Sequence, residues 1–194
     1  MMLIKTKKNK KKNNKTRKKT TNIYVFAYGS LMNQNEMYIT TQQKKTPIPT
    51  IVCCEAGLKR RFNFVTKSSI NVVGLENNIK KNTPINGILY KVNKRNIEKL
   101  DKRENIYIKK TILLEHLHFL KQKIPLNSKI YTYFPKPNQL TIKKKKVFCK
   151  YYLDICLFGV GKFGINFQKM FFETTCKIPE KYSTYEKWKS FYNK

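Results

Sequence analysis

The hydrophobic positions of this chain form short runs in its first two thirds and recur at helical spacing in its last third. The run over residues 22–27 is apolar at nearly every position, which is typical of a strand buried on both faces, so we expect it at the centre of a sheet. It is followed by a Gly-Ser pair that indicates a turn. Five later runs rich in β-branched and aromatic residues predict strands over residues 50–54, 70–75, 85–92, 106–119 (long and bent) and 129–134.

Helical patterns lie between and after these strands. Residues 34–43 predict a short helix, and Pro47 prevents it from continuing. Asn93 is a typical N-cap residue and predicts a helix that ends near Arg103. Two more helices are expected over residues 148–158 and 163–172, separated by a break at Gly159, Gly161 and Gly164.

Strands that come first, with helices inserted and appended, predict an α+β domain with a mixed, strongly curved sheet or a small barrel and flanking helices. Without an internal repeat, residues 21–194 are expected to form one domain around one core. Residues 1–20 are rich in lysine and asparagine and almost lack an apolar face, so we expect a disordered tail.

The formal net charge of +31 allows two interpretations. Ten of the 42 lysines and arginines lie in residues 1–20, a basic run that would suit nucleic acid, another polyanion or a nuclear-import signal. The remaining basic residues are spread evenly, even through loops such as residues 76–82. This even spread favours a general enrichment in lysine and asparagine, so we do not expect nucleic-acid binding to be the main function.

Cysteine usage and hydropathy predict a reduced, cytoplasmic protein. The chain has five cysteines, of which Cys53 and Cys54 are adjacent, and no C-x-x-C pair or visible signal peptide. His116 and His118 would share one face of the strand expected over residues 106–119, but two histidines without a third ligand are a weak metal signal, so no metal is expected. No segment has the roughly eighteen apolar residues of a membrane span.

Four short motifs follow one another along the chain. The stretch over residues 24–31 ends in Tyr-Gly-Ser-Leu. Residues 57–62 read Gly-x-x-Arg-x-Phe, residues 87–90 read Gly-x-x-Tyr, and residues 100–107 read Leu-Asp-x-x-Glu-x-x-Tyr. In this order they resemble the gamma-glutamylcyclotransferase family, including its AIG2-like and ChaC-like relatives, over about residues 23–134. Each motif alone is weak, whereas their agreement is specific.

The resemblance implies an enzyme that needs no metal or cofactor. In this family the α-amine of a γ-glutamyl group attacks its own γ-amide carbonyl, which releases 5-oxoproline and a free amine. The resemblance places the catalytic carboxylate at Glu104, which we expect to act first as a base and then as an acid. We also expect burial to raise the pKa of Glu104, with Lys102 and Arg103 turned away.

The turn after the first strand would supply the other half of the site. Its backbone N–H groups, from Gly29, Ser30 and Leu31, are expected to bind the α-carboxylate of the substrate and to stabilise the oxyanion on the γ-carbonyl. Hydroxyl contacts, ranked below the role of Glu104, are expected from Tyr28, Tyr107 and Tyr133.

Two departures from the family pattern leave the substrate open. Lys109 stands where many relatives have arginine, and Asn105, which is expected to stiffen its turn, replaces a frequent glycine. Glutathione, a γ-glutamyl amino acid and a γ-glutamyl amine all remain candidates. An alternative function is that of a non-enzymatic basic adaptor for RNA or another polyanion on a cyclotransferase-like scaffold. We favour the enzyme because an adaptor has no use for a carboxylate opposite an anion-binding turn.

Overall fold

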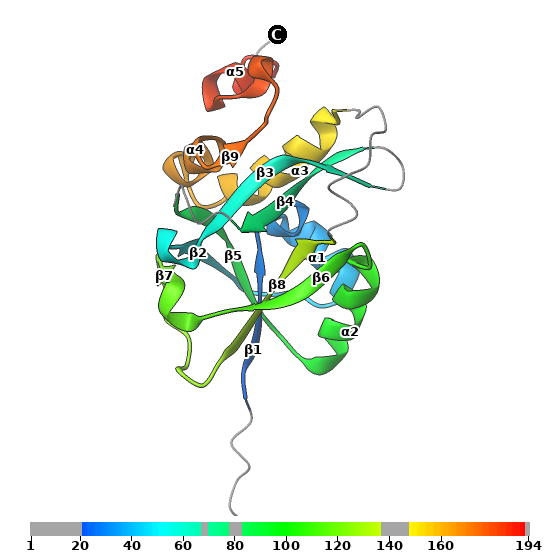
Figure 1. The fold of residues 1–194 in the computed structure, drawn as a ribbon, viewed down its shortest axis with the longest axis vertical. Coiled ribbons are helices and arrows are strands. Elements are labelled where there is room, and N and C mark those ends of the chain that lie inside the picture. Colours follow the sequence, from blue (N-terminus) through cyan, green and yellow to red (C-terminus); the bar gives the residue numbers. More distant parts are fainter. Residues whose placement is uncertain (1–20, 67–69, 78–82, 137–147, 193–194) are drawn as a thin grey trace, which may run out of the picture.

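The structure of the protein is a computed structural model that describes residues 21–66, 70–77, 83–136 and 148–192. The tail predicted over residues 1–20 lies outside the described residues. Two mixed sheets and several helices form the fold, which confirms the predicted α+β class (Figure 1). None of the described helices is long and apolar enough to cross a membrane.

The larger sheet has six strands in the order β6-β8-β1-β5-β2-β7. β1 lies at its centre, antiparallel to β5 and parallel to β8, and four of its five residues are buried. The prediction of a central first strand is therefore confirmed. The strands span β1 Ile23–Ala27, β2 Pro47–Val52, β5 Ile85–Val92, β6 Tyr107–Ile112, β7 Leu117–Phe119 and β8 Lys129–Pro135.

The single long strand predicted over residues 106–119 is wrong. A 3-10 turn at Leu114–His116 divides this segment into β6, which pairs with β8, and β7, which pairs with β2 at the opposite edge of the sheet. The chain can span at most about 18 Å between the ends of β6 and β7, so the sheet must curl strongly to bring its edges together. In the described part of the chain no ladder joins β6 to β7, and the sheet stays open rather than closing into a barrel.

The prediction that the two histidines of this segment share one strand face is also wrong. His116 lies in the 3-10 turn and His118 lies on β7.

The second sheet was not anticipated from the sequence, which predicts only one. It has the order β4-β3-β9, with β3 antiparallel to β4 and parallel to the two-residue strand β9. Three consecutive basic residues in β3 interrupt the apolar alternation that indicates a strand. The bounds are β3 Leu58–Val65, β4 Asn71–Asn77 and β9 Thr175–Cys176.

Four of the helices were predicted to within a few residues. α1 and α2 lie together beside the larger sheet, whereas α5 lies at the C-terminal end of the molecule (Figure 1). Of the three glycines expected to break the helical segment, only Gly164 lies between helices, with a φ of +100° that favours glycine. The helices are α1 Gln34–Thr41, α2 Lys94–Arg103, α3 Lys150–Gly161, α4 Ile165–Glu173 and α5 Tyr185–Lys189.

Gly159, inside α3, allows this helix to approach the turn after β1. A Cβ atom at Gly159 would lie 2.5 Å from the backbone nitrogen of Asn33 and 2.6 Å from the carbonyl carbon of Met32. The side-chain amide of Asn33 also donates to the carbonyl of Ile155 in α3, at 3.4 Å. α3 is thus packed directly against the segment that contains Tyr-Gly-Ser-Leu.

The adjacent arginines of β3 have different environments. Arg60 is completely buried, and its guanidinium donates to the side chains of Asn86, Thr174 and Thr175. Arg61 is only partly buried and lies 3.2 Å from the carboxylate of Glu76. Arg60 therefore belongs to the core and ties β3 to β5 and to the segment after α4.

Candidate active site

One cavity between the two sheets and α3 is lined by every site residue predicted from the sequence. It is small, with about 30 Å³ open to the centre of a water molecule. Its walls come from β1 and the turn after it, the end of α2, and the starts of β6 and α3, with further contacts from β4 and β8. The predicted residues in this lining are Tyr28, Gly29, Ser30, Leu31, Glu104, Tyr107 and Tyr133; Phe26, Ala27, Val73 and Tyr152 complete it.

Glu104 is held at the C-terminal end of α2. The helix starts where the side chain of Asn93 accepts from the N–H of Asn96, and it buries Ile97 and Leu100 on one face. At the other end, the N–H of Glu104 donates to the carbonyl of Leu100 at 2.8 Å. The local sequence thus fixes the backbone of Glu104 while its side chain, 16% exposed, enters the cavity.

Burial raises the pKa of Glu104, and Arg103 opposes this effect by its charge and its hydrogen bond. The expectation that Lys102 and Arg103 both turn away is only half right. Lys102 is exposed, but Nε of Arg103 lies 3.1 Å from Oε1 of Glu104. Among the described residues, the carboxylate therefore has one cationic partner in a largely buried setting.

The Tyr-Gly-Ser-Leu turn contributes Gly29, Ser30 and Leu31 to the cavity wall. After β1 the chain enters a 3-10 turn at Ser30–Met32, in which the N–H of Met32 donates to the carbonyl of Gly29 at 2.9 Å. Within the described chain, the N–H groups of Gly29, Ser30 and Leu31 donate to no backbone carbonyl in such a turn. They are thus available to an anionic group in the cavity.

The other sequence motifs converge on this turn. Tyr90 donates its hydroxyl to the carbonyl of Met32 at 3.1 Å, and Nη1 of Arg60 lies 3.5 Å from the carbonyl of Tyr28. Gly87 lets β5 pack closely on β1, because a Cβ there would lie 2.4 Å from the carbonyl oxygen of Ala27. These motif residues support the backbone of the turn from outside the cavity.

The predicted tyrosines form a hydrogen-bonded wall. Tyr28 donates its hydroxyl to the carbonyl of Tyr133, and Tyr133 donates its own to Asp101 at 2.8 Å. The hydroxyl of Tyr107 lies 3.5 Å from the carbonyl of Val73. Burial raises the pKa of all three tyrosines, so they remain neutral hydroxyls at neutral pH.

Sequence reasoning did not identify Tyr152. This residue of α3 accepts from the N–H of Val73 at 3.4 Å, and its hydroxyl oxygen lies 2.9 Å from the place where a Cβ of Gly29 would be. Its spacing with the buried Cys156 indicates an inward-facing position, whereas the neighbouring Tyr151 is exposed. That pattern identifies the buried face of α3, but it does not show that this face lines a cavity.

The two departures from the family pattern do not disturb the cavity. Nζ of Lys109 lies 2.5 Å from the carboxylate of Asp101. Asn105 has no left-handed φ, since Gln42 and Lys177 are the only described residues other than glycine with a positive φ. The turn after Glu104 therefore has no conformational need for glycine.

Comparisons with known proteins agree with this architecture. The solved structure of a gamma-glutamyl cyclotransferase has a TM-score of 0.56 at 13% identity and covers 89% of this chain and 99% of its own. An uncharacterized protein from Homo sapiens gives 0.55 at 14%, covering 90% and 100%. A yeast gamma-glutamyl cyclotransferase specific to glutathione gives 0.53 at 14%, covering 75% and 90%. These TM-scores, at identities of 13–14%, establish a shared fold.

A comparison with curated proteins finds no match. The sequence profile of the family described as "Gamma-glutamyl cyclotransferase, AIG2-like" matches residues 25–150, which is more than half of the chain. This range begins within β1, contains the Tyr-Gly-Ser-Leu turn, Arg60 and Glu104, and ends just before Tyr152. The chain therefore belongs to the AIG2-like gamma-glutamyl cyclotransferase family.

Proposed function

We propose that the protein is a gamma-glutamyl cyclotransferase that converts a γ-glutamyl amide into 5-oxoproline and a free amine. The main observation in support of this proposal is that Glu104 and the turn at residues 28–31 line the same cavity. A partly buried carboxylate, together with backbone N–H groups that donate to no backbone carbonyl among the described residues, suits a substrate that has an ammonium group and a carboxylate on one carbon atom. Membership of the family supports the same reaction.

The proposed reaction needs one group that accepts and then returns a proton. The α-ammonium group loses one proton to water, and Glu104 takes a second proton as this nitrogen forms a bond to the γ-carbonyl carbon. As this tetrahedral intermediate collapses, the bond between the γ-carbon and the amide nitrogen breaks, and the leaving nitrogen receives a proton from Glu104. No oxidant, reductant or second substrate is required.

In this proposal, the turn and the tyrosine wall hold the substrate for ring closure. The N–H groups of Gly29, Ser30 and Leu31 bind the α-carboxylate, which fixes the amine near the γ-carbonyl and makes cyclisation effectively unimolecular. The same N–H groups are also donors for the developing oxyanion on the γ-carbonyl.

The direct test is an assay of 5-oxoproline release by the purified protein. Three substrates separate the candidate leaving groups: glutathione, a γ-glutamyl amino acid and a γ-glutamyl amine such as ε-(γ-glutamyl)lysine. We expect 5-oxoproline from at least one of them, in equal amount to the released amine. Release from none of the three would contradict the proposed function.

Gly29→Ala is expected to lower kcat/KM about tenfold or more, the scale of a small misplacement in a near-attack geometry. The new methyl group would meet the hydroxyl of Tyr152 at 2.9 Å and narrow the cavity. Gly29 has a φ of −128°, so the glycine is needed for space rather than for a left-handed φ. The effect should appear in kcat/KM with little change in melting temperature.

Tyr152→Phe provides the matched control, because it removes only the hydroxyl group that the new methyl would meet. In a double-mutant cycle of the four proteins, Tyr152→Phe should recover part of the loss caused by Gly29→Ala. Additive effects of the two substitutions would show that Tyr152 and Gly29 do not meet in the working site.

A further inference from the structure

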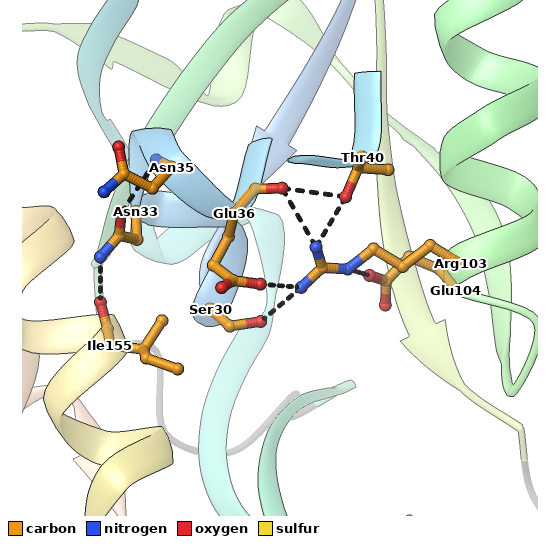
Figure 2. Close-up of polar contacts among 8 residues, drawn as sticks. All are labelled: Ser30, Asn33, Asn35, Glu36, Thr40, Arg103, Glu104 and Ile155. Atoms are coloured by element: carbon orange, nitrogen blue, oxygen red, sulfur yellow. Dashed lines mark hydrogen bonds and ion pairs between the residues drawn. The ribbon is translucent and has the colours of Figure 1, made fainter. Parts of the chain in front are cut away.

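The guanidinium of Arg103 contacts Ser30 of the cavity wall and two residues of α1, in addition to the proposed base Glu104. In Figure 2 its guanidinium lies between three parts of the chain: α1, the turn after β1, and Glu104. Nη2 donates to the carboxylate of Glu36 at 2.8 Å and to Oγ of Ser30 at 3.4 Å. Nη1 donates to Oγ1 of Thr40 at 2.6 Å and to the carbonyl of Glu36 at 3.1 Å, while Nε faces Glu104 at 3.1 Å.

We propose that Arg103 is a positioning residue that couples the proton-transferring carboxylate of Glu104 to the carboxylate-binding turn through one rigid guanidinium. This inference rests on the proposed function and assigns a residue to it. A planar fork of five N–H donors fixes the directions of its partners relative to one another, which a flexible ammonium group cannot do. The orientation of the Glu104 carboxylate therefore depends on the position of Ser30, and the position of the Ser30 side chain depends on that of Glu104.

The second part of this role is electrostatic. A base must be unprotonated before it can accept a proton, but the cavity disfavours a charged carboxylate at Glu104. Arg103 is the cation in contact with Glu104 in the described part of the chain, whereas Lys102 is exposed and Lys109 is bound to Asp101. Arg103 therefore keeps the carboxylate ionised at a lower pH than burial alone would allow.

The remaining groups around Glu104 do not replace this cation. The residues that face it from the first turn, β6, β8 and α3 are neutral tyrosines: Tyr28, Tyr107, Tyr133 and Tyr152. From α1, the carboxylate of Glu36 shares the same guanidinium and so opposes the ionisation of Glu104. Asp101 of α2 is bound by Lys109 and Tyr133.

A purely structural role for Arg103 is the competing interpretation, because its bonds to Glu36 and Thr40 also join α1 to α2. The two roles predict different results. A structural tie changes the melting temperature and leaves the ionisation of Glu104 alone. A positioning role moves the midpoint of the acidic limb of the pH profile of kcat/KM, which reports the group that must be unprotonated in the free enzyme.

The test compares Arg103→Gln with Arg103→Lys, with the exposed Arg95→Gln of the same helix as a control. Two readouts are followed: the pH profile of kcat/KM and the titration of the Glu104 carboxylate by carbon-13 NMR. Arg103→Gln should move both midpoints to higher pH, and below the midpoint kcat/KM should fall about tenfold for each pH unit that the midpoint moves. Arg103→Lys should give an intermediate midpoint and a raised KM, because the charge remains but the bond to Ser30 is lost. Arg95→Gln should leave both readouts unchanged.

Glu36→Gln tests the sign of the coupling with a variant that keeps the side-chain shape. Removing the negative charge of Glu36 leaves the guanidinium more fully available to Glu104, so the midpoint should move to lower pH. If Arg103→Gln fails to fold, Glu36→Gln and Arg103→Lys still decide the matter. An unchanged Glu104 midpoint in the folded variants would overturn the proposal.

The failure of this proposal can be told apart from failure of the proposed function. If no γ-glutamyl substrate yields 5-oxoproline, the function is wrong, but the NMR titration still measures the effect of Arg103 on Glu104. If 5-oxoproline is released and the midpoints do not move, the function stands and the positioning role of Arg103 is wrong.

Discussion

Replacing Glu104 with glutamine is expected to lower the rate of 5-oxoproline release by about 10²- to 10⁴-fold, the usual contribution of a general acid–base group. Glutamine has nearly the same shape and can still accept from Arg103, but it cannot take up and return a proton. Because its backbone bond to Leu100 is unaffected, the fold should persist. The measurement is the single-turnover rate at saturating substrate, together with circular dichroism of the variant.

The same substitution is expected to raise the melting temperature at neutral pH. Burial raises the pKa of Glu104 in the folded state, so the folded protein binds a proton more tightly than the unfolded chain does. The stability that this group contributes is present below the ordinary pKa of glutamate, about 4.3, and is lost as the pH rises through the raised value. Glutamine avoids this loss at pH 7, whereas the two proteins should differ little near pH 4.

The exposed Glu98→Gln on α2 is the control for both effects and should change neither the rate nor the melting temperature appreciably. Full turnover in Glu104→Gln would remove Glu104 from the role of the base. A lower melting temperature in Glu104→Gln at pH 7 would instead show that the contact with Arg103 outweighs the burial of the carboxylate.

Arg60→Ala is expected to lower the free energy of unfolding by about 2–4 kcal/mol, through a cavity and several unpaired acceptors. Burial lowers the pKa of Arg60 to about 9, so the side chain is still charged at neutral pH. Hydroxyl and amide oxygens of Asn86, Thr174 and Thr175 satisfy it, and its guanidinium lies 4.1 Å from the ring centre of Phe171. Relief of the buried charge offsets part of the loss.

The neighbouring Arg61→Ala is a matched control, since it removes the same side chain from the same strand. Its partly exposed pair with Glu76 should contribute no more than about 1 kcal/mol. Denaturant unfolding of the two variants measures the difference. Equal effects would contradict the assignment of Arg60 to the core and of Arg61 to the surface.

Local signals in the sequence predicted most of the elements, and long-range pairing explains what they missed. The Asn93 cap and the apolar face of α2 locate that helix to within a residue. By contrast, Ile106–Phe119 has the residue types of a single strand, and only pairing with β8 and β2 decides that it becomes two. The second sheet depends in the same way on β9, whose two residues are too short a signal to recognise.

In the candidate site, too, local motifs were recognised from the sequence and long-range contacts were not. The order of the motifs identified Glu104 and the turn at residues 28–31 as candidate site residues, and both line the cavity. The place of Tyr152 in the cavity wall depends on the packing of Gly159 in α3 against the turn, a long-range contact that no local sequence pattern indicates. The contact of Arg103 with Glu104 was predicted wrongly, because burial of the carboxylate suggested that nearby cations would face solvent, whereas α1 supplies partners that hold Arg103 inward.

A crystal structure of the protein with bound 5-oxoproline would show directly whether Glu104 and the turn at residues 28–31 hold the glutamyl group. We predict that the carboxylate of the product lies within hydrogen-bond distance of the N–H groups of Gly29, Ser30 and Leu31. We also predict that the ring nitrogen, formerly the α-amine, lies within hydrogen-bond distance of the Glu104 carboxylate. A product bound outside this cavity, or bound with its ring nitrogen away from Glu104, would exclude the proposed roles of these residues.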